Sequence, residues 1–369
     1  MKISRFMSEA LFHPSRGYYR TKNPIGKESD FITAPEISQV FGELLAAYLV
    51  QIASSKKSTI ALVEMGAGRG TLFKDVLNSI RNLAEKKIPQ AVDFLARATF
   101  HIVEISPVLQ KVQKENLSEF EVKWYEDFSD FILHNRASEI FFVSNELFDC
   151  FPIDQFIKTE AGWCERMIGG GNAREILKQV QDDSEGEFLS YCHPELVSGS
   201  KPSHFFLADF NQKSHDFIEN EIGRTAPINA VFEHSLEARN FMTQLCQSLK
   251  QQGGIGIIID YGYIKNEFAN TFQAIKNHQK CHVLENFGEA DLTALVDFLA
   301  LEKIAQNCDL NSSLISQGQF LVGLGIEERR EVLLAKKSAA QQKEINLAID
   351  RLIDSNQMGE LFKCLIIWS

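Results

Sequence analysis

The chain has 369 residues, of which 44% are hydrophobic and 24% charged, and its formal net charge is −11 at pH 7. This composition is typical of a globular protein that can bury a sizeable core. The excess of acid argues against a nucleic-acid partner, because phosphates are bound by clustered Lys and Arg. It is compatible with a cationic ligand.

The cysteines and the amino-terminal stretch indicate the cellular compartment of the protein. The chain has seven cysteines, an odd number with no Cys-x-x-Cys pair, which favours reduced thiols over a disulfide framework or a zinc site. We therefore expect no metal. No stretch resembles the apolar region of a signal peptide or is long enough to span a membrane. The sequence thus predicts a protein of the bacterial cytosol, without a signal or transit peptide and without a membrane span.

The first 58 residues are predicted to be mainly helical. Residues 3–12 have apolar positions at helical spacing, and "PEIS" looks like the start of a second, buried helix over 37–50. The stretch "DFITAPEIS" before that helix contains Thr33, Pro35 and Glu36. Whether Glu36 caps the helix or lines a ligand pocket is left open by the sequence. We expect this amino-terminal segment to contribute to a ligand site.

From Thr59 onward, short apolar runs alternate with amphipathic helices. The alternation predicts βαβ units and an α/β fold, in which helices cover both faces of a mostly parallel sheet. The domain formed in this way comprises 59–168 and 204–369. The predicted strands are 59–65, 98–105, 139–147 and 253–262, and the first two predicted helices of this domain are 70–83 and 107–117.

Two later regions depart from this alternation. Residues 169–203 are rich in Gly, Ser and charge with little apolar periodicity, which predicts a flexible insertion. After Asn311, the run 317–326 is predicted to be strand-like, and 329–353 is predicted to be helical.

The segment "LVEMGAGRGTL" predicts a cofactor loop. Gly66, Gly68 and Gly70 stand between a strand and a helix, where a bare backbone lets a ligand approach closely. A dinucleotide fingerprint would need another glycine where Thr71 stands. The spacing, preceded by Glu64, is instead that of class I S-adenosylmethionine methyltransferases. An acid at this position suits a cofactor that carries an ammonium and a sulfonium.

Two further acids follow neighbouring strands. Glu104 ends the second strand, where a carboxylate can accept both hydrogens of a ribose diol. The alternative is that Glu104 caps the helix that begins at Pro107. Asp127 follows the next strand and could accept a hydrogen bond from the amino group of adenine, although the aromatic residues around it are equally compatible with a core segment.

The fourth strand is followed by "VSNELFDCFPIDQF", which places Asn145, Glu146 and Asp149 in an aromatic turn. Carboxylates here could orient a methyl acceptor, accept its proton or stabilise its positive charge. A guanidinium, which stays protonated in water, suits paired acids particularly well. The alternative is a set of surface acids with a helix cap.

Together these motifs resemble one family. "SDFITAPEISQVFGELLA", "LVEMGAGRGTL", "HIVEISPVL", "SNELFDCFPIDQF", "IDYGY", "GEADLTALVDF" and "MGELFKCL" occur in the order found in the MidA family. The resemblance implies a class I methyltransferase (Rossmann-like) fold with a seven-stranded sheet and added helical segments, and S-adenosylmethionine as the cofactor. A mitochondrial relative of that family is a protein arginine methyltransferase that makes symmetric ω-N-dimethylarginine on a core subunit of the respiratory NADH dehydrogenase.

The motifs and this resemblance together imply roles for individual residues. Those expected to bind the cofactor are Thr33, Pro35, Glu36, Glu64, Gly66, Gly68, Gly70, Glu104 and Asp127, and those expected to act on the acceptor are Asn145, Glu146 and Asp149. The function expected is therefore methylation of arginine in a partner protein, a subunit of a complex I type enzyme. Two alternatives stay open: methylation of a small molecule or another protein side chain, and a non-catalytic assembly factor that binds the cofactor.

Overall fold

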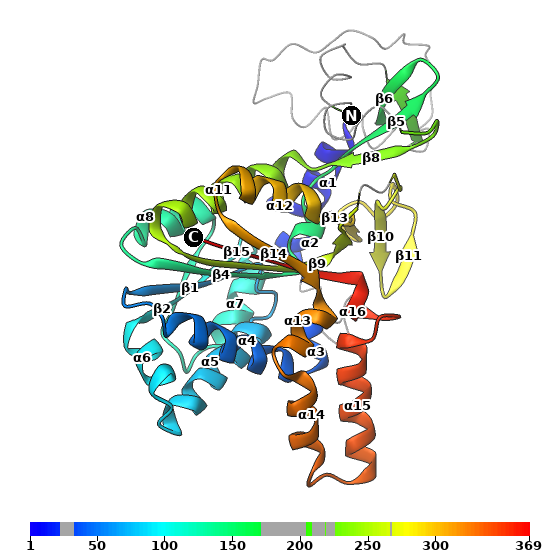
Figure 1. Cartoon of the computed structure of the whole chain (residues 1–369). Coiled ribbons are helices and arrows are strands. Elements are labelled where there is room, and N and C mark those ends of the chain that lie inside the picture. Colours follow the sequence, from blue (N-terminus) through cyan, green and yellow to red (C-terminus); the bar gives the residue numbers. More distant parts are fainter. Residues whose placement is uncertain (23–32, 171–203, 209–217, 219–225, 266–267) are drawn as a thin grey trace.

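A central sheet runs through the middle of the molecule (Figure 1). The computed structural model describes residues 1–22, 33–170, 204–208, 218, 226–265 and 268–369. The sheet has the strand order β14-β15-β9-β4-β1-β2-β3, and the short β13 pairs with the end of β9. Its strands are β1 (Ile60–Met65), β2 (Ala98–Val103), β3 (Val122–Tyr125), β4 (Glu139–Asn145), β9 (Gly254–Tyr263), β13 (Val296–Asp297), β14 (Asn311–Ser316) and β15 (Phe362–Trp368).

The strand directions confirm the predicted mostly parallel α/β sheet. The strands from β3 to β9 are parallel to their neighbours, whereas β15 lies antiparallel between β9 and β14. The order of the strands along the chain reverses between β1 and β4. In open α/β sheets such a switch point opens a crevice at the carboxyl ends of the strands, and this is where the predicted site residues lie.

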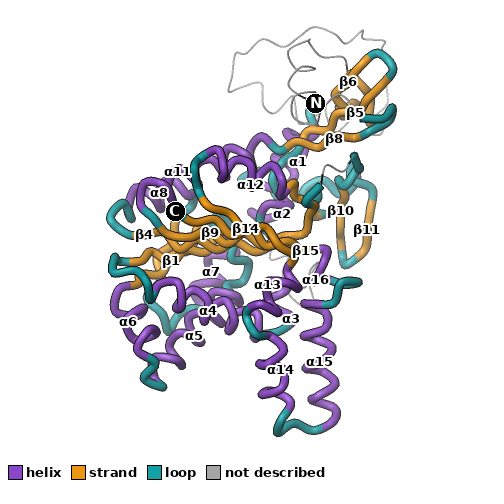
Figure 2. Tube along the Cα trace, in the orientation of Figure 1, coloured by secondary structure: helices purple, strands orange, loops and turns teal. Residues whose placement is uncertain are grey.

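Helices cover both faces of the sheet (Figure 2). One face packs against α4 (Val40–Ala53), α5 (Thr71–Glu85) and α6 (Pro89–Arg97), and the other against α8 (Phe128–His134), α11 (Leu236–Gln252) and α12 (Phe298–Asn307). Successive side chains of a strand point to opposite faces. Accordingly, Leu62 of β1 lies in the first core and Val63 in the second.

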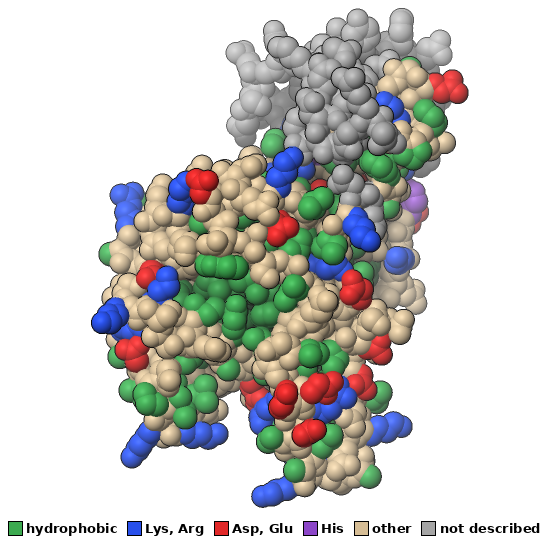
Figure 3. Space-filling view, viewed as in Figure 1, with side chains coloured by type: hydrophobic (Ala, Val, Ile, Leu, Met, Phe, Trp, Pro, Cys, Tyr) green, Lys and Arg blue, Asp and Glu red, His purple; other side chains and the backbone are tan. Residues whose placement is uncertain are grey.

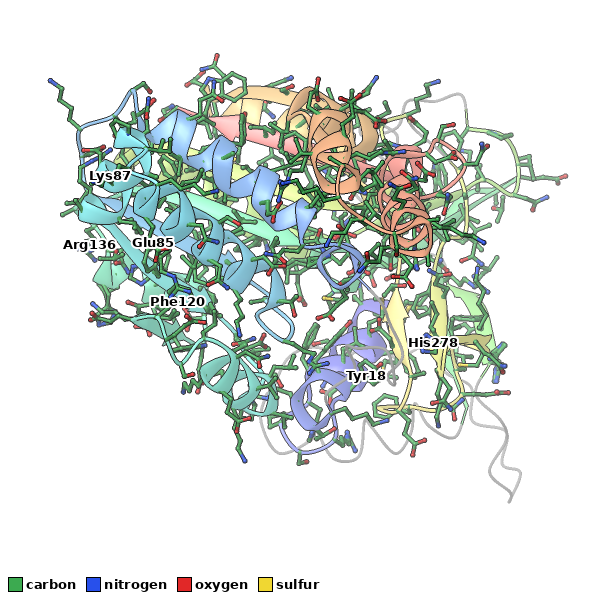
Figure 4. The ribbon with its side chains drawn as sticks, turned by 90° about the horizontal axis from the view of Figure 1, so that it is seen from below. Tyr18, Glu85, Lys87, Phe120, Arg136 and His278 are labelled. Carbon is green, nitrogen blue, oxygen red and sulfur yellow. The ribbon has the colours of Figure 1, made fainter. Side chains whose placement is uncertain are left out.

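Further short helices lie near the carboxyl ends of the strands. They are α1 (Ile3–Phe12), α2 (Tyr18–Thr21), α3 (Ala34–Ile37) and α7 (Pro107–Asn116). The predicted helix over 3–12 is confirmed as α1, whose apolar side packs in a core with Ala274 and Leu292. Seen from below, Tyr18 lies on the side of His278, at the turn between β10 (Gln273–Lys276) and β11 (Gln279–Cys281), and away from Lys87 and Arg136 (Figure 4).

Two small antiparallel sheets were not predicted, because only helical additions were expected. One has the order β7-β6-β5-β8 and the other β11-β10-β12. The strands are β5 (Asp154–Thr159), β6 (Gly162–Gly169), β7 (His204–Ala208), β8 (Val231–His234), β10 (Gln273–Lys276), β11 (Gln279–Cys281) and β12 (Asp291–Thr293). The predicted insertion over 169–203 lies outside the described residues, apart from Gly169 and Gly170.

The carboxy-terminal region is helical until its last strand. Its helices are α13 (Gln317–Gly323), α14 (Ile326–Leu334), α15 (Ala339–Ile353) and α16 (Met358–Leu361). The strand-like prediction over 317–326 was therefore wrong. A capping box at Ser316 and Gln319 starts α13 instead. The helical prediction over 329–353 is confirmed, and α14 and α15 project from the body as a pair (Figure 1).

The charges on the surface and the apolar character of the helices are relevant to two classes of partner, nucleic acids and membranes. Acidic and basic side chains are interspersed on the face that Figure 3 shows, without a continuous basic area there. Within the described ranges, no helix has the length and apolar character needed to cross a bilayer.

Candidate active site

A cavity of about 800 Å³ lies at the carboxyl ends of β1 to β4. Seven of the twelve predicted site residues line it, and five do not. Those that line it are Thr33, Gly66, Gly68, Glu104, Asp127, Glu146 and Asp149, and those outside its lining are Pro35, Glu36, Glu64, Gly70 and Asn145. The fold thus gathers segments separated by more than a hundred residues around one space.

The glycine turn forms one wall of the cavity. Gly66 and Gly68 line it in the left-handed region, with φ of +70° and +54°. A Cβ atom on Gly66 would lie 2.7 Å from Leu147 Cδ1, at the end of a flexible side chain, so the positive φ is the main reason for glycine at this position. Gly70 lies behind the wall, where it precedes α5 with φ of +79°. It shapes the turn without facing the cavity.

Glu104 is a buried carboxyl group on the cavity wall. Its Oε1 accepts from the amide of Ser106 at 2.8 Å, and its Oε2 accepts from Gln113 Nε2 at 3.0 Å. Gln113 Nε2 also donates to the carbonyl of Gly68 at 2.8 Å, which ties the second strand to the glycine turn. Burial raises the pKa of Glu104 to about 7. The residue that caps α7 is Ser106, not Glu104.

Glu64 lies beneath the glycine turn rather than on the cavity wall. It is buried, and burial together with Glu104 raises its pKa to about 8. Its Oε2 accepts no hydrogen bond within the part of the chain that is described. The amide of Phe73, in the first turn of α5, opposes the rise in pKa. Within the described structure, Glu64 therefore supports the loop from behind.

The "ITAPE" segment and Asp127 flank the cavity at opposite ends. Thr33 lines it, whereas Glu36 Oε1 accepts from Thr71 Oγ1 at 2.5 Å and so holds the first residue of α5. Pro35 is buried in α3. Asp127 both lines the cavity and caps α8, because its Oδ1 accepts from the amide of Asp130 at 2.8 Å.

Glu146 is the central acid of the fourth-strand turn. It has a left-handed backbone, with φ of +53°. Its carboxyl Oε1 accepts from the amide of Ala34 at 3.3 Å and from Asn145 Nδ2 at 3.1 Å. Burial and the neighbouring Asp149 raise the pKa of Glu146 to about 8. Asn145 lies behind Glu146 and fixes its carboxyl group.

Asp149 and an acid that the sequence analysis missed complete this turn. Asp149 is buried and accepts from the hydroxyl of Tyr261, and burial raises its pKa to about 6. The missed residue is Asp260, which is fully buried near the end of β9. Its Oδ2 accepts from the amides of Leu147, Phe148 and Asp149 at 3.0, 2.8 and 3.2 Å. Asp260 thereby fixes the backbone of the turn, which forms the short 3₁₀ helix η1 (Phe148–Cys150).

A second missed pair approaches the cavity from other elements. Tyr19 of α2 donates through its hydroxyl to Asp291 Oδ1 of β12 at 2.8 Å, and both residues line the cavity. The signal for Asp260 and Asp291 was present in the sequence. Each is an acid in an apolar run that was noted only for its resemblance.

The charged side chains that line the cavity are all acidic, and the cations that act on them, Arg20 on Glu104 and Arg351 on Glu146, lie outside the lining. Among the described residues, its lining contains seven carboxyl groups and no Lys, Arg or His. The seven are Glu104, Glu126, Asp127, Glu146, Asp149, Glu237 and Asp291. No group of three or more His, Cys, Asp or Glu side chains in the described ranges is arranged to hold a metal ion. The arrangement suits organic cations.

Comparison with known proteins agrees with this geometry. A family model described as "Putative S-adenosyl-L-methionine-dependent methyltransferase" matches residues 44–316. The chain is 31% identical to the Danio rerio protein arginine methyltransferase NDUFAF7, mitochondrial, over 98% of this chain and 82% of that protein. It is 29% identical to the Homo sapiens protein of the same name, over 98% of this chain and 78% of that protein.

A solved structure shows the same fold. A likely methyltransferase of the COG1565 superfamily from Burkholderia thailandensis, bound to S-adenosyl-homocysteine, superposes with a TM-score of 0.76 at 24% identity. The match covers 100% of this chain and 88% of that one. It includes the central sheet as well as the added segments around it.

Proposed function

Because the chain belongs to this family of S-adenosyl-L-methionine-dependent methyltransferases, we propose that it methylates arginine side chains of a partner protein. The cofactor is S-adenosyl-L-methionine. Arginine as the methyl acceptor is our proposal. It is supported by the names of the relatives, which are protein arginine methyltransferases. We further propose symmetric ω-N-dimethylarginine as the product, as the family resemblance of the motifs implies.

The residues on the cavity wall fit the cofactor. Gly66 and Gly68 present backbone without side chains, and Glu104 presents a carboxyl group fixed by Gln113, which suits a ribose diol. When bound, the cofactor supplies a methyl group activated by a sulfonium. The acids of the lining suit its positive charge. Glu64, which lies beneath the glycine turn, adds a further carboxyl group near Glu104.

One observation carries the choice of acceptor: two acids, the half-buried Glu146 and the buried Asp149, face a cavity that has no basic side chain in its described lining. Burying carboxyl groups without a cation is unfavourable, and the raised pKa values of both acids reflect this. A guanidinium would relieve the cost, because it is planar, always charged and able to donate to two carboxylates.

The side chains have distinct tasks in this proposal. Glu146, held by Asn145 and Ala34, would orient the guanidinium. A carboxylate whose conjugate acid has a pKa of about 8 can also accept the proton that the guanidinium loses when one of its nitrogens is methylated. Asp149, held by Tyr261, would supply the second negative charge.

The test is methyl transfer from labelled S-adenosylmethionine to protein acceptors, with the products identified by mass spectrometry. We expect methylarginine with the unaltered chain and loss of the product with Glu146→Gln, while binding of the cofactor is kept. The matched control is Glu289→Gln, which changes an exposed acid outside the cavity. Label on a small molecule or on another side chain would contradict arginine as the acceptor.

We propose a subunit of a complex I type respiratory enzyme as the partner, and the bacterial cytosol as the compartment. The motif resemblance supports the first, and the odd number of cysteines without a Cys-x-x-Cys pair, which is typical of reduced thiols, motivates the second. Mapping of methylarginine in that enzyme, from cells with and without the protein, tests the partner. If Glu146→Gln cells assemble the enzyme normally and disruption of partner docking alone prevents assembly, the protein is a non-catalytic assembly factor.

A further inference from the structure

A second hollow, of about 690 Å³, opens beside the acidic cavity. It lies among β6, β7, β10 and β11, and we call it the side groove. Tyr261, Gln273 and Leu361 line both the cavity and the side groove. The two spaces therefore adjoin at these three residues, which we call the shared rim.

The side groove has the opposite charge to the cavity. Its described lining contains Arg166, Lys280 and His282, and no Asp or Glu. Lys280 is exposed, and no carboxylate in the described ranges lies within ion-pair distance of it. Two adjoining spaces, one lined by acids and one by bases, form a bipolar surface.

Arg166 is held in place within the groove. Its guanidinium stacks 3.7 Å from the ring centroid of Phe205, and its Nη1 donates to Gln155 Oε1 at 2.9 Å. A stacked guanidinium loses less conformational freedom when it pairs with a ligand, so its hydrogen bonds cost less to form. At the rim, Leu361 is 50% exposed and offers an apolar contact to a chain that crosses it.

We propose that the side groove binds the substrate polypeptide next to its target arginine, and that it selects an acidic residue, Asp or Glu, a few positions from that arginine. The inference rests on the proposed function, which supplies the arginine. It adds a sequence preference: a cation for the acidic cavity and, close by, a carboxylate for Lys280 and Arg166. Charge complementarity of this kind fixes register and rejects partners of the wrong sign.

Labelled peptides with one central arginine test the proposal. In one series an aspartate stands at each neighbouring position in turn, and in the matched series asparagine replaces it. Binding to the full chain is measured by fluorescence anisotropy with S-adenosylhomocysteine present. Exposed ion pairs are worth up to about 1 kcal/mol, so we expect aspartate at the favoured position to strengthen binding about three- to fivefold. Added salt should reduce this preference.

The variant Lys280→Glu should abolish or invert the preference for aspartate. The control Lys303→Glu makes the same charge change on α12, outside both spaces, and should keep the preference. Equal binding of the two series, no binding of any peptide, or a preference that survives Lys280→Glu would overturn the inference.

A third series separates this inference from the proposed function. It replaces the arginine by citrulline, which has the same shape without the charge. If the aspartate preference depends on Lys280 but citrulline binds as well as arginine, the side groove stands and arginine as the acceptor fails. If arginine is required and methylated in intact proteins but the flanking residue is irrelevant, the proposed function stands and the side groove fails.

Discussion

Glu146 combines a strained backbone with a half-buried carboxyl group. A residue other than glycine in the left-handed region costs about 1 kcal/mol, and such strain persists where the surroundings hold the residue in place. Here the amide of Glu146 donates to the carbonyl of Ile259 at 2.9 Å, and its carboxyl group accepts from Ala34. The strain aims the side chain at the cavity from the end of β4.

The raised pKa of Glu146 predicts how activity depends on pH. The carboxylate is the form that binds and deprotonates a guanidinium, so kcat/KM should fall as the pH drops through a value near 8. In Glu146→Gln this fall of kcat/KM at lower pH should disappear, and the rate should be lower by about 10²-fold or more. The measurement is kcat/KM across the neutral and mildly alkaline range. If kcat/KM of the variant depended on pH as before, the titrating group would be a residue other than Glu146.

The sequence predicted the acids that directly follow strands, since their position at the sheet edge follows from the fold. It could not predict Asp260 as the anchor of the fourth-strand turn, because its partner Leu147 is 113 residues away. Likewise, nothing local shows that Tyr19 meets Asp291. These contacts depend on how distant segments pack, and a single sequence does not show that packing.

At the scale of elements, the glycine turn between β1 and α5 predicts a matched pair of variants. Gly66→Ala places a Cβ atom against Leu147 at a φ of +70°. We expect cofactor affinity to fall at least about tenfold, because a backbone that shifts by a few tenths of an ångström no longer matches its ligand. The control is Gly323→Ala in α13, where the added Cβ meets nothing within 4 Å. Isothermal titration with S-adenosylmethionine checks both, and equal affinities would contradict the prediction.

The turn after β4 gives a second prediction. Asp260→Asn keeps the shape but replaces one carboxylate oxygen by an amide donor, so at least one backbone N–H loses its acceptor. Hydrogen bonds to charged groups are worth about 1.5–3 kcal/mol. We expect a loss of stability of that order in denaturant unfolding, and a lower kcat with cofactor affinity retained. The exposed control Asp309→Asn should change neither, and a loss of cofactor affinity alone would refute the positioning role.

The elements themselves were predictable where apolar runs are long. The strands near 59–65, 98–105, 139–147 and 253–262 were placed correctly because they are buried on both faces. The run 317–326 failed because a short apolar stretch has no decisive period. The small sheets failed for another reason: strands such as β5 and β7 are partly exposed, and the partner of β7 lies far from it along the chain.

For the whole molecule, the buried acids predict that stability declines with pH. Glu64, Glu104, Glu146 and Asp149 have pKa values of about 8, 7, 8 and 6, all raised by burial. At pH values between the ordinary pKa of a carboxyl group and these raised pKa values, the folded chain binds more protons than the unfolded chain. The stability of the folded chain therefore falls as the pH rises. We expect a loss of at least about 1 kcal/mol, the equivalent of one pKa unit in one group.

Thermal unfolding across this range tests the prediction. The melting temperature should fall between about pH 6 and about pH 8, the range set by these pKa values. It should fall less in Glu146→Gln, which lacks one of the acids. His101, whose pKa burial lowers from 6.5 to about 4, is neutral in the folded chain but is partly protonated near pH 6 in the unfolded chain, so it opposes the fall at the lower end of this range. A melting temperature that is constant or rises with pH would contradict the prediction.

The position of β15 has a consequence for how the protein is made. This strand follows both β9 and β14 along the chain, yet it lies between them in the sheet, one strand from the edge. During synthesis the amino-terminal part of a chain emerges first, so β14 must wait, without its partner, for residues that leave the ribosome after it. Leu361 and Phe362, on the cavity wall, follow every other residue of its described lining along the chain. A nascent chain therefore cannot complete this wall until the residues up to Phe362 have left the ribosome, and a chain interrupted before them has no complete catalytic centre.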